Sequence, residues 1–265
     1  THISLFVLCL GIGLVLAPKG LFARGLWLVP LIFLLLPAKE IKKPPFLMWV
    51  FDAGQSLAVY LETPEGNLLY DTAWGNEQGA TANSILIPFF KQKNIQHLDK
   101  LIISHGDADH AGGLAVVSKA VTIGELLSGE KLEGNTRLSQ PNWDKSCHDF
   151  PSWQWGRLSF KFLQHLSIAK TGNNSSCVLS ISDNKNRVLL TGDIEKGAEE
   201  RLLENGLNSY QILIAPHHGS ETSSSPKFVK AVAPNQVVFS TGYDNQWHFP
   251  REKVIKRYQN LGSLI

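Results

Sequence analysis

The sequence predicts an α/β fold in which metal-binding side chains gather at the ends of buried strands. Three short apolar runs each lead into aspartate or histidine: residues 101–103, 188–190 and 212–214. Four potential ligands follow the first run within six residues: His105, Asp107, Asp109 and His110. A solvated face would alternate in polarity instead of placing ligands at the tips of strands. A strand end holds its ligands on a stiff edge, as a hydrolytic metal site requires.

Short strands dominate the first half of the predicted fold. They are expected at residues 47–51, 57–62 and 67–70, with a tight turn at 64–66. A helix is predicted at 81–93, a buried strand at 101–104 and a second helix at 112–119. Asp71 comes to a strand end, where we expect it to support the ligand loop through backbone hydrogen bonds instead of touching metal.

The second half contains a second set of strands, without a visible internal sequence repeat. Strands are predicted at 157–163, 176–181, 187–190 and 211–215, and helices at 195–205 and from Ser225-Pro226 onward, with a serine cap and proline in the first turn. The two sets of strands indicate two sheets. Residues 129–155 between them are polar and turn-rich, and we expect their tryptophans to pack beside a sheet in preference to stacking on bases: Trp143, Trp153 and Trp155.

An apolar leader precedes these strands. Residues 3–17 and 26–36 are apolar and are separated by a polar break, and neither reaches the roughly 20 apolar residues of a full span. The first run is interpreted as the end of a longer transmembrane helix, with a signal peptide as the alternative. The second is a short span, an interfacial helix or a buried core helix. Pro44-Pro45 indicates a stiff linker, so we predict a transmembrane or membrane-associated leader and linker at 1–43 and a hydrolase domain at 44–265.

Composition limits the class of protein. The chain has 265 residues, of which 43% are hydrophobic, enough to bury one large α/β core. Its formal net charge is only +2, so a polyanion would have to meet a local basic patch. The cysteines are odd in number and form no Cys-x-x-Cys pair, so neither a disulfide framework nor a thiolate zinc finger is expected: Cys9, Cys147 and Cys177.

Four motifs, taken in order, resemble those of the metallo-β-lactamase superfamily: Leu-Tyr-Asp-Thr at 69–72, His-x-Asp-x-Asp-His at 105–110, Thr-Gly-Asp at 191–193 and Pro-His-His-Gly at 216–219. Segments 51–55, 173–176, 189–195, 217–220 and 223–226 resemble, more narrowly, the C-terminal domain of ComEC-type DNA-internalisation competence proteins. The resemblance extends from about Phe46 to the end of the chain. It implies an αβ/βα four-layer sandwich with a binuclear metal site between two sheets.

The resemblance also implies a set of ligands. One ion would be held by His105 and Asp107, and the other by Asp109, His110 and His218, with Asp193 as the bridge. Asp109 is alternatively the group that positions the nucleophilic water. Two features favour a harder, oxygen-rich site that takes zinc or manganese. Asp107 stands where the commonest form of the superfamily motif has histidine. The superfamily's third motif usually supplies a further histidine, and here the corresponding region offers only His165, Asn173 or Asn174 in place of a clear ligand.

Other residues have more than one interpretation. His248 resembles a late family histidine that would protonate the leaving oxygen or contact phosphate, and it could equally lie beside a helix cap. His217 could contact phosphate, support its neighbour or be structural. Asn174 and Ser176 could bind phosphate oxygens or form an Asx-type turn. Six basic residues form either a nucleic-acid track or solvated helix faces: Lys227, Lys230, Arg251, Lys253, Lys256 and Arg257.

Two divalent cations suit phosphodiester hydrolysis, since they activate water and neutralise phosphoryl oxygens. Together with the resemblance, this predicts a metal-dependent nuclease that degrades or processes DNA during uptake. Its expected location is the bacterial inner (plasma) membrane, with the catalytic domain on the outer or periplasmic side. The expected partners are DNA, the membrane and the channel part of the same full-length protein. Alternatives are hydrolysis of another phosphodiester such as a phosphocholine ester, hydrolysis of a β-lactam, or a non-catalytic DNA guide or gate.

Overall fold

The computed structural model describes residues 12, 44, 46–76, 79–132, 144–163 and 171–265. The chain divides into two compact units, Thr1–Pro44 and Pro45–Ile265. Apart from residues 12 and 44, the predicted leader and linker lie outside the described residues. Within the described ranges, no helix has both the length and the apolar character needed to cross a membrane. The second unit contains all of the elements described below.

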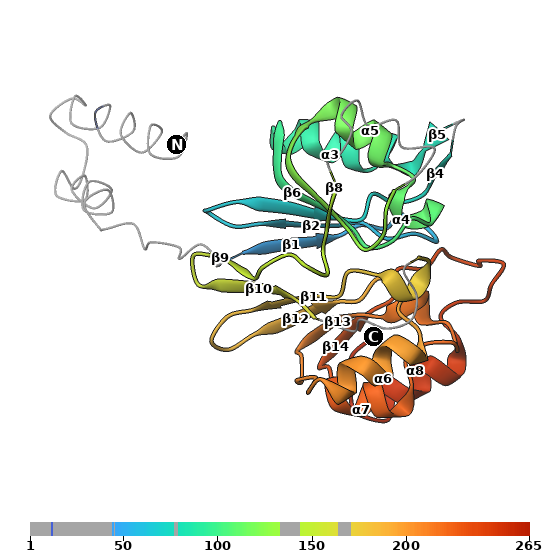
Figure 1. Ribbon diagram of the computed structural model, residues 1–265. Helices are drawn as coiled ribbons and strands as arrows, with labels where there is room; N and C mark the ends of the chain where they lie inside the picture. Colours follow the sequence, from blue (N-terminus) through green and yellow to red (C-terminus); the bar gives the residue numbers. More distant parts are fainter. Residues whose placement is uncertain (1–11, 13–43, 45, 77–78, 133–143, 164–170) are drawn as a thin grey trace, which may run out of the picture. The chain divides into compact units, whose positions relative to one another are not determined.

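Two six-stranded sheets pack face to face and carry helices on their outer faces (Figure 1). The first sheet has the order β1 (Leu47–Val50), β2 (Val59–Glu62), β3 (Asn67–Tyr70), β6 (His97–Ile103), β7 (Thr122–Ser128), β8 (Asp144–Ser146). The second has the order β14 (Gln236–Val238), β13 (Ile212–Ile214), β12 (Arg187–Leu190), β11 (Leu179–Ser182), β10 (Leu158–Phe162), β9 (Trp153–Trp155). A small hairpin joins β4 (Gly75–Asn76) to β5 (Gly79–Ala80).

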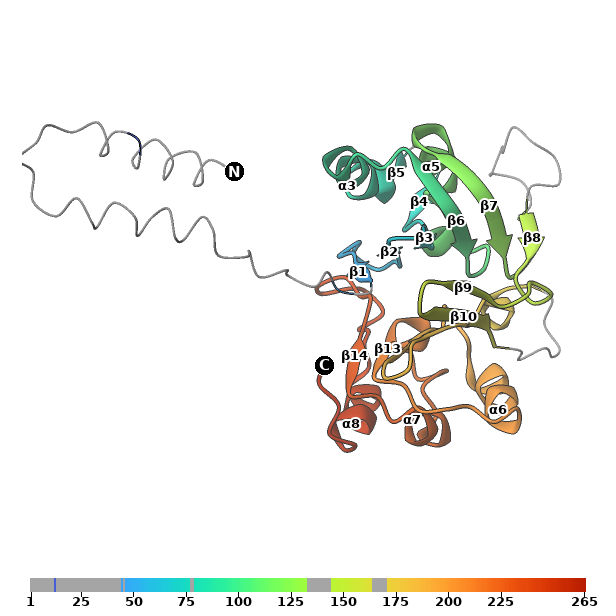
Figure 2. The same ribbon diagram turned by 90° about the vertical axis from the view of Figure 1, so that its left-hand side faces the viewer.

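The helices fall into two groups, one on each sheet (Figures 1 and 2). The first sheet carries the 3-10 helix η2 (Thr81–Asn83) and the helices α3 (Leu86–Lys93) and α5 (Leu114–Ala120), whereas the short α4 (Ala108–Ala111) lies in the loop between β6 and α5. The second carries α6 (Lys196–Glu204), α7 (Pro226–Val232) and α8 (Glu252–Gln259). Two short 3-10 helices, η3 (Asn173–Ser175) and η4 (Pro216–Gly219), lie in loops. The predicted metallo-β-lactamase arrangement of two sheets with outer helices is confirmed.

Side-chain alternation along the strands creates three apolar layers. In β6, Leu101 and Ile103 face the helices α3 and α5, whereas Ile102 faces the other sheet. In β12, Leu190 faces the first sheet, and Leu189 packs beneath α6 and α7. Successive strand residues point to opposite faces, so a continuous apolar run is what a strand covered on both sides requires.

Some elements differ from the sequence prediction. The helix expected at 81–93 is divided into η2 and α3, and β6 begins at His97 instead of residue 101. Six strands were not predicted: β4, β5, β7, β8, β9 and β14. The tryptophans of β9 are partly buried and pack against the core, as expected: the Trp153 ring stacks on Phe160 with the centroids 4.9 Å apart, and Trp155 packs edge-on against the same ring. Trp143 lies outside the described residues.

A disulfide between Cys147 and Cys177 joins the two sheets, so the prediction of no disulfide was wrong. Cys147 follows β8 in the first sheet, and Cys177 precedes β11 in the second. Both side chains are fully buried and the Cα atoms are 5.9 Å apart. Cys9 takes no part in this bond, which accounts for the odd cysteine count.

Removal of this bond is expected to destabilise the fold. Cys147→Ser should lower the free energy of unfolding by about 3–4 kcal/mol, because the bond closes a loop of 30 residues and limits the unfolded chain. Urea denaturation under oxidising conditions measures the change, with Cys9→Ser as the matched control. If both variants unfold at the wild-type midpoint, the disulfide makes no contribution to stability.

Candidate metal centre

Parallel strands bring the predicted ligands to one edge of the sandwich. β3 runs parallel to β6, and β12 runs parallel to β13. Asp71 follows β3 directly, the loop with His105 follows β6, Asp193 lies just beyond β12, and His218 lies just beyond β13. The carboxyl ends of parallel neighbours point the same way, so these four segments meet where the two sheets face each other.

Four of the predicted ligands form a compact cluster: Asp109, His110, Asp193 and His218. One potential ligand atom from each lies within 4.8 Å of all the others. His110 Nε2 is 3.1 Å from Asp193 Oδ1, and His218 Nε2 is 3.2 Å from Asp109 Oδ2. Imidazole and carboxylate groups in this number are the donor set of a divalent cation site.

His105 and Asp107 extend the cluster on one side. The His105 and His110 rings lie 4.3 Å apart, centroid to centroid. His105 is fully buried, and its Nε2 atom has no hydrogen-bond partner among the described residues, although Asp107 Oδ2 is 3.4 Å away. A buried polar atom without a partner is costly unless a ligand satisfies it. This nitrogen and the neighbouring carboxylate therefore fit a second cation.

Buried hydrogen bonds orient the two central imidazoles. Asp71 Oδ2 accepts a bond from His110 Nδ1 at 2.7 Å and another from Ser104 Oγ, while its Oδ1 accepts from the Ser104 backbone N–H. His218 Nδ1 is 2.6 Å from the carbonyl oxygen of Ser240. Each histidine donates from Nδ1, which turns its Nε2 atom toward the cluster. Ser104 and Ser240 have no motif of their own, and sequence reasoning missed both.

The segment that resembles the third motif supports the ligand loops. Ser176 Oγ accepts from the Asp193 backbone N–H at 3.0 Å and is fully buried. Asn174 Oδ1 accepts from the Glu195 N–H at 2.8 Å. Glu130, which sequence reasoning missed, accepts from the N–H groups of Gly106 and Gly172 and so connects the two loops. A substrate contact of Asn174 or Ser176 stays a prediction, and His165 lies outside the described residues.

Charges in the cluster perturb one another strongly. Burial lowers the pKa of His110, but the charges of Asp193 and Asp71 outweigh it and hold that pKa well above its ordinary value. Burial raises the pKa of Asp193, but the charges of His110 and His218 reverse this effect, so that this pKa lies far below its usual range. The Asp193 carboxylate therefore stays ionised while buried, which requires compensating positive charge. A divalent cation meets that requirement.

The remaining predicted residues lie around the cluster. His217 Nε2 is 3.8 Å from Asp193 Oδ2, and its Nδ1 is 3.0 Å from Thr222 Oγ1. His248 is exposed in the loop between β14 and α8. Of the basic residues, Arg257 donates to the carbonyls of Ser223 and Ser224, so it supports a turn. The proposed roles of these residues toward substrate stay predictions.

The fold and this ligand set identify the class of protein. The sequence profile of the metallo-beta-lactamase superfamily matches residues 51–243. The chain belongs to the metallo-β-lactamase superfamily.

Within that class, the chain is related to competence proteins. It is 33% identical to Recombination protein 2 of Haemophilus influenzae over 90% of this chain and 29% of that protein. It is 34% identical to Competence protein ComA of Neisseria gonorrhoeae over 95% of this chain and 35% of that protein. ComE operon protein 3 of Bacillus subtilis is 27% identical over 79% of this chain and 30% of that protein. The predicted resemblance is confirmed, and the chain spans about a third of the length of these relatives.

A solved structure shows the same fold. The metallo-beta-lactamase fold protein YhfI from Bacillus subtilis superposes with a TM-score of 0.52 at 14% sequence identity, covering 83% of this chain and 95% of that one. The similarity at this identity extends to the fold alone.

The carboxylate at position 107 is expected to limit zinc affinity. Asp107→His should increase zinc retention about tenfold or more against a chelator, because imidazole is a softer ligand than carboxylate. Competition with a chelator followed by metal analysis measures the change, and Asp183→His on the distant hairpin between β11 and β12 is the control. The wild type should take up manganese; tight retention of two zinc ions by the wild type would contradict this expectation.

Proposed function

We propose that this protein is a metal-dependent phosphodiester hydrolase that cleaves DNA during its uptake. The observation that carries the proposal is the convergence of Asp109, His110, Asp193 and His218 beside the unpartnered His105 nitrogen. A binding or guiding surface has no need to bury the ionised carboxylate of Asp193 among imidazoles. The names of the relatives, a recombination protein and competence proteins, support DNA as the substrate.

The chain's own groups have distinct tasks in this chemistry. Divalent cations, when bound, would acidify water and neutralise charge on the phosphoryl oxygens. His110 and His218 present Nε2 to the cluster because Asp71 and Ser240 hold their Nδ1 atoms. Asp109 has the most exposed side chain of the four clustered residues, at 30%. It is therefore the carboxylate best placed to orient the attacking water, with His248 as the proposed proton donor to the leaving oxygen.

The disulfide supports a location outside the cytoplasm. Structural disulfides form and persist in oxidising compartments and are rare where thiols are kept reduced. Cys147 and Cys177 pair in the catalytic unit itself. This favours the outer or periplasmic side of the plasma membrane for that unit, with DNA meeting it before passing through the channel part of the full-length protein.

Cleavage should depend on the clustered carboxylates. Asp193→Ala removes a carboxylate that lies near both His110 and His218. Asp109→Ala removes one carboxylate that is both a predicted metal ligand and the proposed water-orienting group. Each should lower DNA cleavage by more than about 100-fold, since loss of supporting groups alone commonly costs 10–100-fold in metal-site function. The measurement is cleavage of labelled single- and double-stranded DNA by the 265-residue chain with added manganese or zinc.

Glu204→Ala is the matched control, because Glu204 is exposed on α6 and pairs only at the surface with Arg201. It should cleave at the wild-type rate. Equal residual cleavage by all variants would indicate a contaminating nuclease. Wild-type binding of DNA without any cleavage would favour the guide or gate interpretation.

A further inference from the structure

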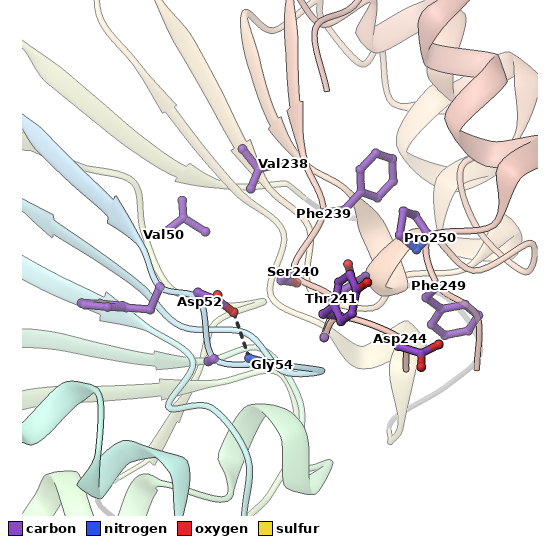
Figure 3. Close-up of a pocket in the computed structure, with 14 residues that line it drawn as sticks. Val50, Asp52, Gly54, Val238, Phe239, Ser240, Thr241, Asp244, Phe249 and Pro250 are labelled. Carbon is purple, nitrogen blue, oxygen red and sulfur yellow. Dashed lines mark hydrogen bonds between the residues drawn. The ribbon is translucent and has the colours of Figure 1, made fainter. Parts of the chain in front are cut away.

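A cavity of about 540 Å³ lies between two loops at the edge of the sandwich (Figure 3). Residues 50–54, at the end of β1, form one wall, and residues 238–244, at the end of β14, form the other. Phe249 and Pro250 complete the lining. Its volume is within the roughly 300–1,000 Å³ of sites that hold small organic groups.

Ser240 connects this cavity to the metal-ligand cluster. It lines the cavity, and its carbonyl oxygen accepts the hydrogen bond from His218 Nδ1. The Nε2 atom on the other side of the same ring is 3.2 Å from Asp109 Oδ2. Ser240 and the His218 ring therefore lie between the cavity and the clustered carboxylates. The Gly242 N–H donates to Gln55 Oε1 at 3.3 Å, which ties the second wall to the first.

The lining combines flat apolar surfaces with carboxylates. Phe249 and Pro250 supply the apolar surfaces, and Asp52 and Asp244 belong to opposite walls, with Asp52 Oδ1 accepting a hydrogen bond from the Gly54 N–H at 3.4 Å (Figure 3). Both aspartates are exposed. Tyr243 also lines the cavity, and its relative exposure is 103%, so packing within the chain gives no reason for an aromatic ring here. An aromatic ring without internal contacts beside a cavity is suited to stacking on a flat ligand.

We propose that the cavity binds a nucleobase of single-stranded DNA, next to the phosphodiester that reaches the metal centre. The proposal rests on the proposed function, because it names the form of substrate that the same site takes. Tyr243 stacks on the base, as exposed aromatic residues do in single-strand binding proteins. Asp52 and Asp244 accept hydrogen bonds from the base edge, where exocyclic amino groups are donors to carboxylates.

The distribution of charge separates the base from the phosphate. Asp52 and Asp244 repel a phosphate, so the sugar-phosphate backbone stays outside the cavity. Positive charge lies at the rim instead, where the Arg251 guanidinium sits 5.5 Å from the centroid of the Phe249 ring. In a duplex, both faces and the pairing edge of the base are covered. A base therefore enters only when it is unstacked and unpaired, which selects single strands.

The test compares oligonucleotides of equal charge with and without bases. Fluorescence anisotropy measures the binding of labelled 12-mers of deoxycytidine, and of 12-mers that carry abasic sugars, to the 265-residue chain with a chelator present to prevent cleavage. The wild type should bind the deoxycytidine 12-mer at least tenfold more tightly. Tyr243→Ala should weaken that binding about fivefold to tenfold and leave abasic binding unchanged, in line with the contribution of one stacked base. Asp244→Asn should also weaken binding of the deoxycytidine 12-mer selectively.

Leu261→Ala is the control, because Leu261 is an exposed apolar residue outside the cavity lining. Tyr243 is fully exposed, so its replacement leaves the fold intact. Equal binding of both 12-mers by the wild type, or equal loss of both in Tyr243→Ala, overturns the proposal. A separate assay of DNA cleavage distinguishes the two proposals. Base-dependent binding without cleavage contradicts the proposed hydrolase activity alone. Cleavage without base-dependent binding contradicts the proposed base-binding cavity alone.

Discussion

The buried carboxylate of Asp71 is the interaction on which the metal-ligand edge depends. It accepts bonds from the backbone N–H and the hydroxyl of Ser104 and from the His110 ring, at 2.6–2.8 Å. Its own N–H donates to Ile102, and the next residue, Thr72, donates to the His110 carbonyl. Asp71 is in the left-handed region, with φ 59°, which aspartate tolerates better than most residues. One side chain thereby joins the end of β3 to the whole loop after β6.

Burial gives these polar groups their rigidity. His110 and Ser104 are fully buried, and Asp193 is 4% exposed. An unsatisfied polar group in such a place costs about 1–3 kcal/mol, so each hydrogen bond that satisfies one also fixes its geometry. His105 Nε2 is the exception inside this network, and it lies where a cation would complete it. The side chains of the site are therefore held in fixed positions before any cation binds. Such preorganisation is what a catalytic site requires.

The two halves of the sandwich contribute unequal parts of the site. The first sheet supplies the densely packed ligand loop 105–110, and the second supplies Asp193 and His218. Their alignment relies on cross-sheet contacts. Tyr70 in the first sheet donates its hydroxyl proton to the Cys177 carbonyl at 2.6 Å, and Cys177 is itself bonded to Cys147. Ser176, which directly precedes Cys177, accepts a hydrogen bond from the Asp193 backbone N–H. The disulfide thus stiffens the contact between the two sheets. This contact sets the distance between the loop 105–110 on one sheet and Asp193 and His218 on the other.

Local sequence determined the positions of the strand ends and of the clustered predicted ligands. The apolar runs before residues 104, 191 and 215 predicted β6, β12 and β13, because both faces of those strands are covered and the runs show no polar alternation. The motifs at 105–110 and 216–219 predicted the compact ligand cluster through their resemblance to the superfamily, and geometry brings their side chains together. Element boundaries were less accurate, since pairing with neighbours extends or shortens a strand.

Tertiary structure alone decided the rest. β7, β8, β9 and β14 contain glycine, charges or polar residues, and they become strands only because a neighbouring strand completes their hydrogen bonds. Cys147 and Cys177 carry no local signal of pairing, because a disulfide depends on the distance between Cα atoms in the folded chain. Glu130 and Ser240 act through bonds to residues 24 and 22 positions away. Such roles are set by contacts distant in sequence, which the composition and periodicity of a segment do not encode.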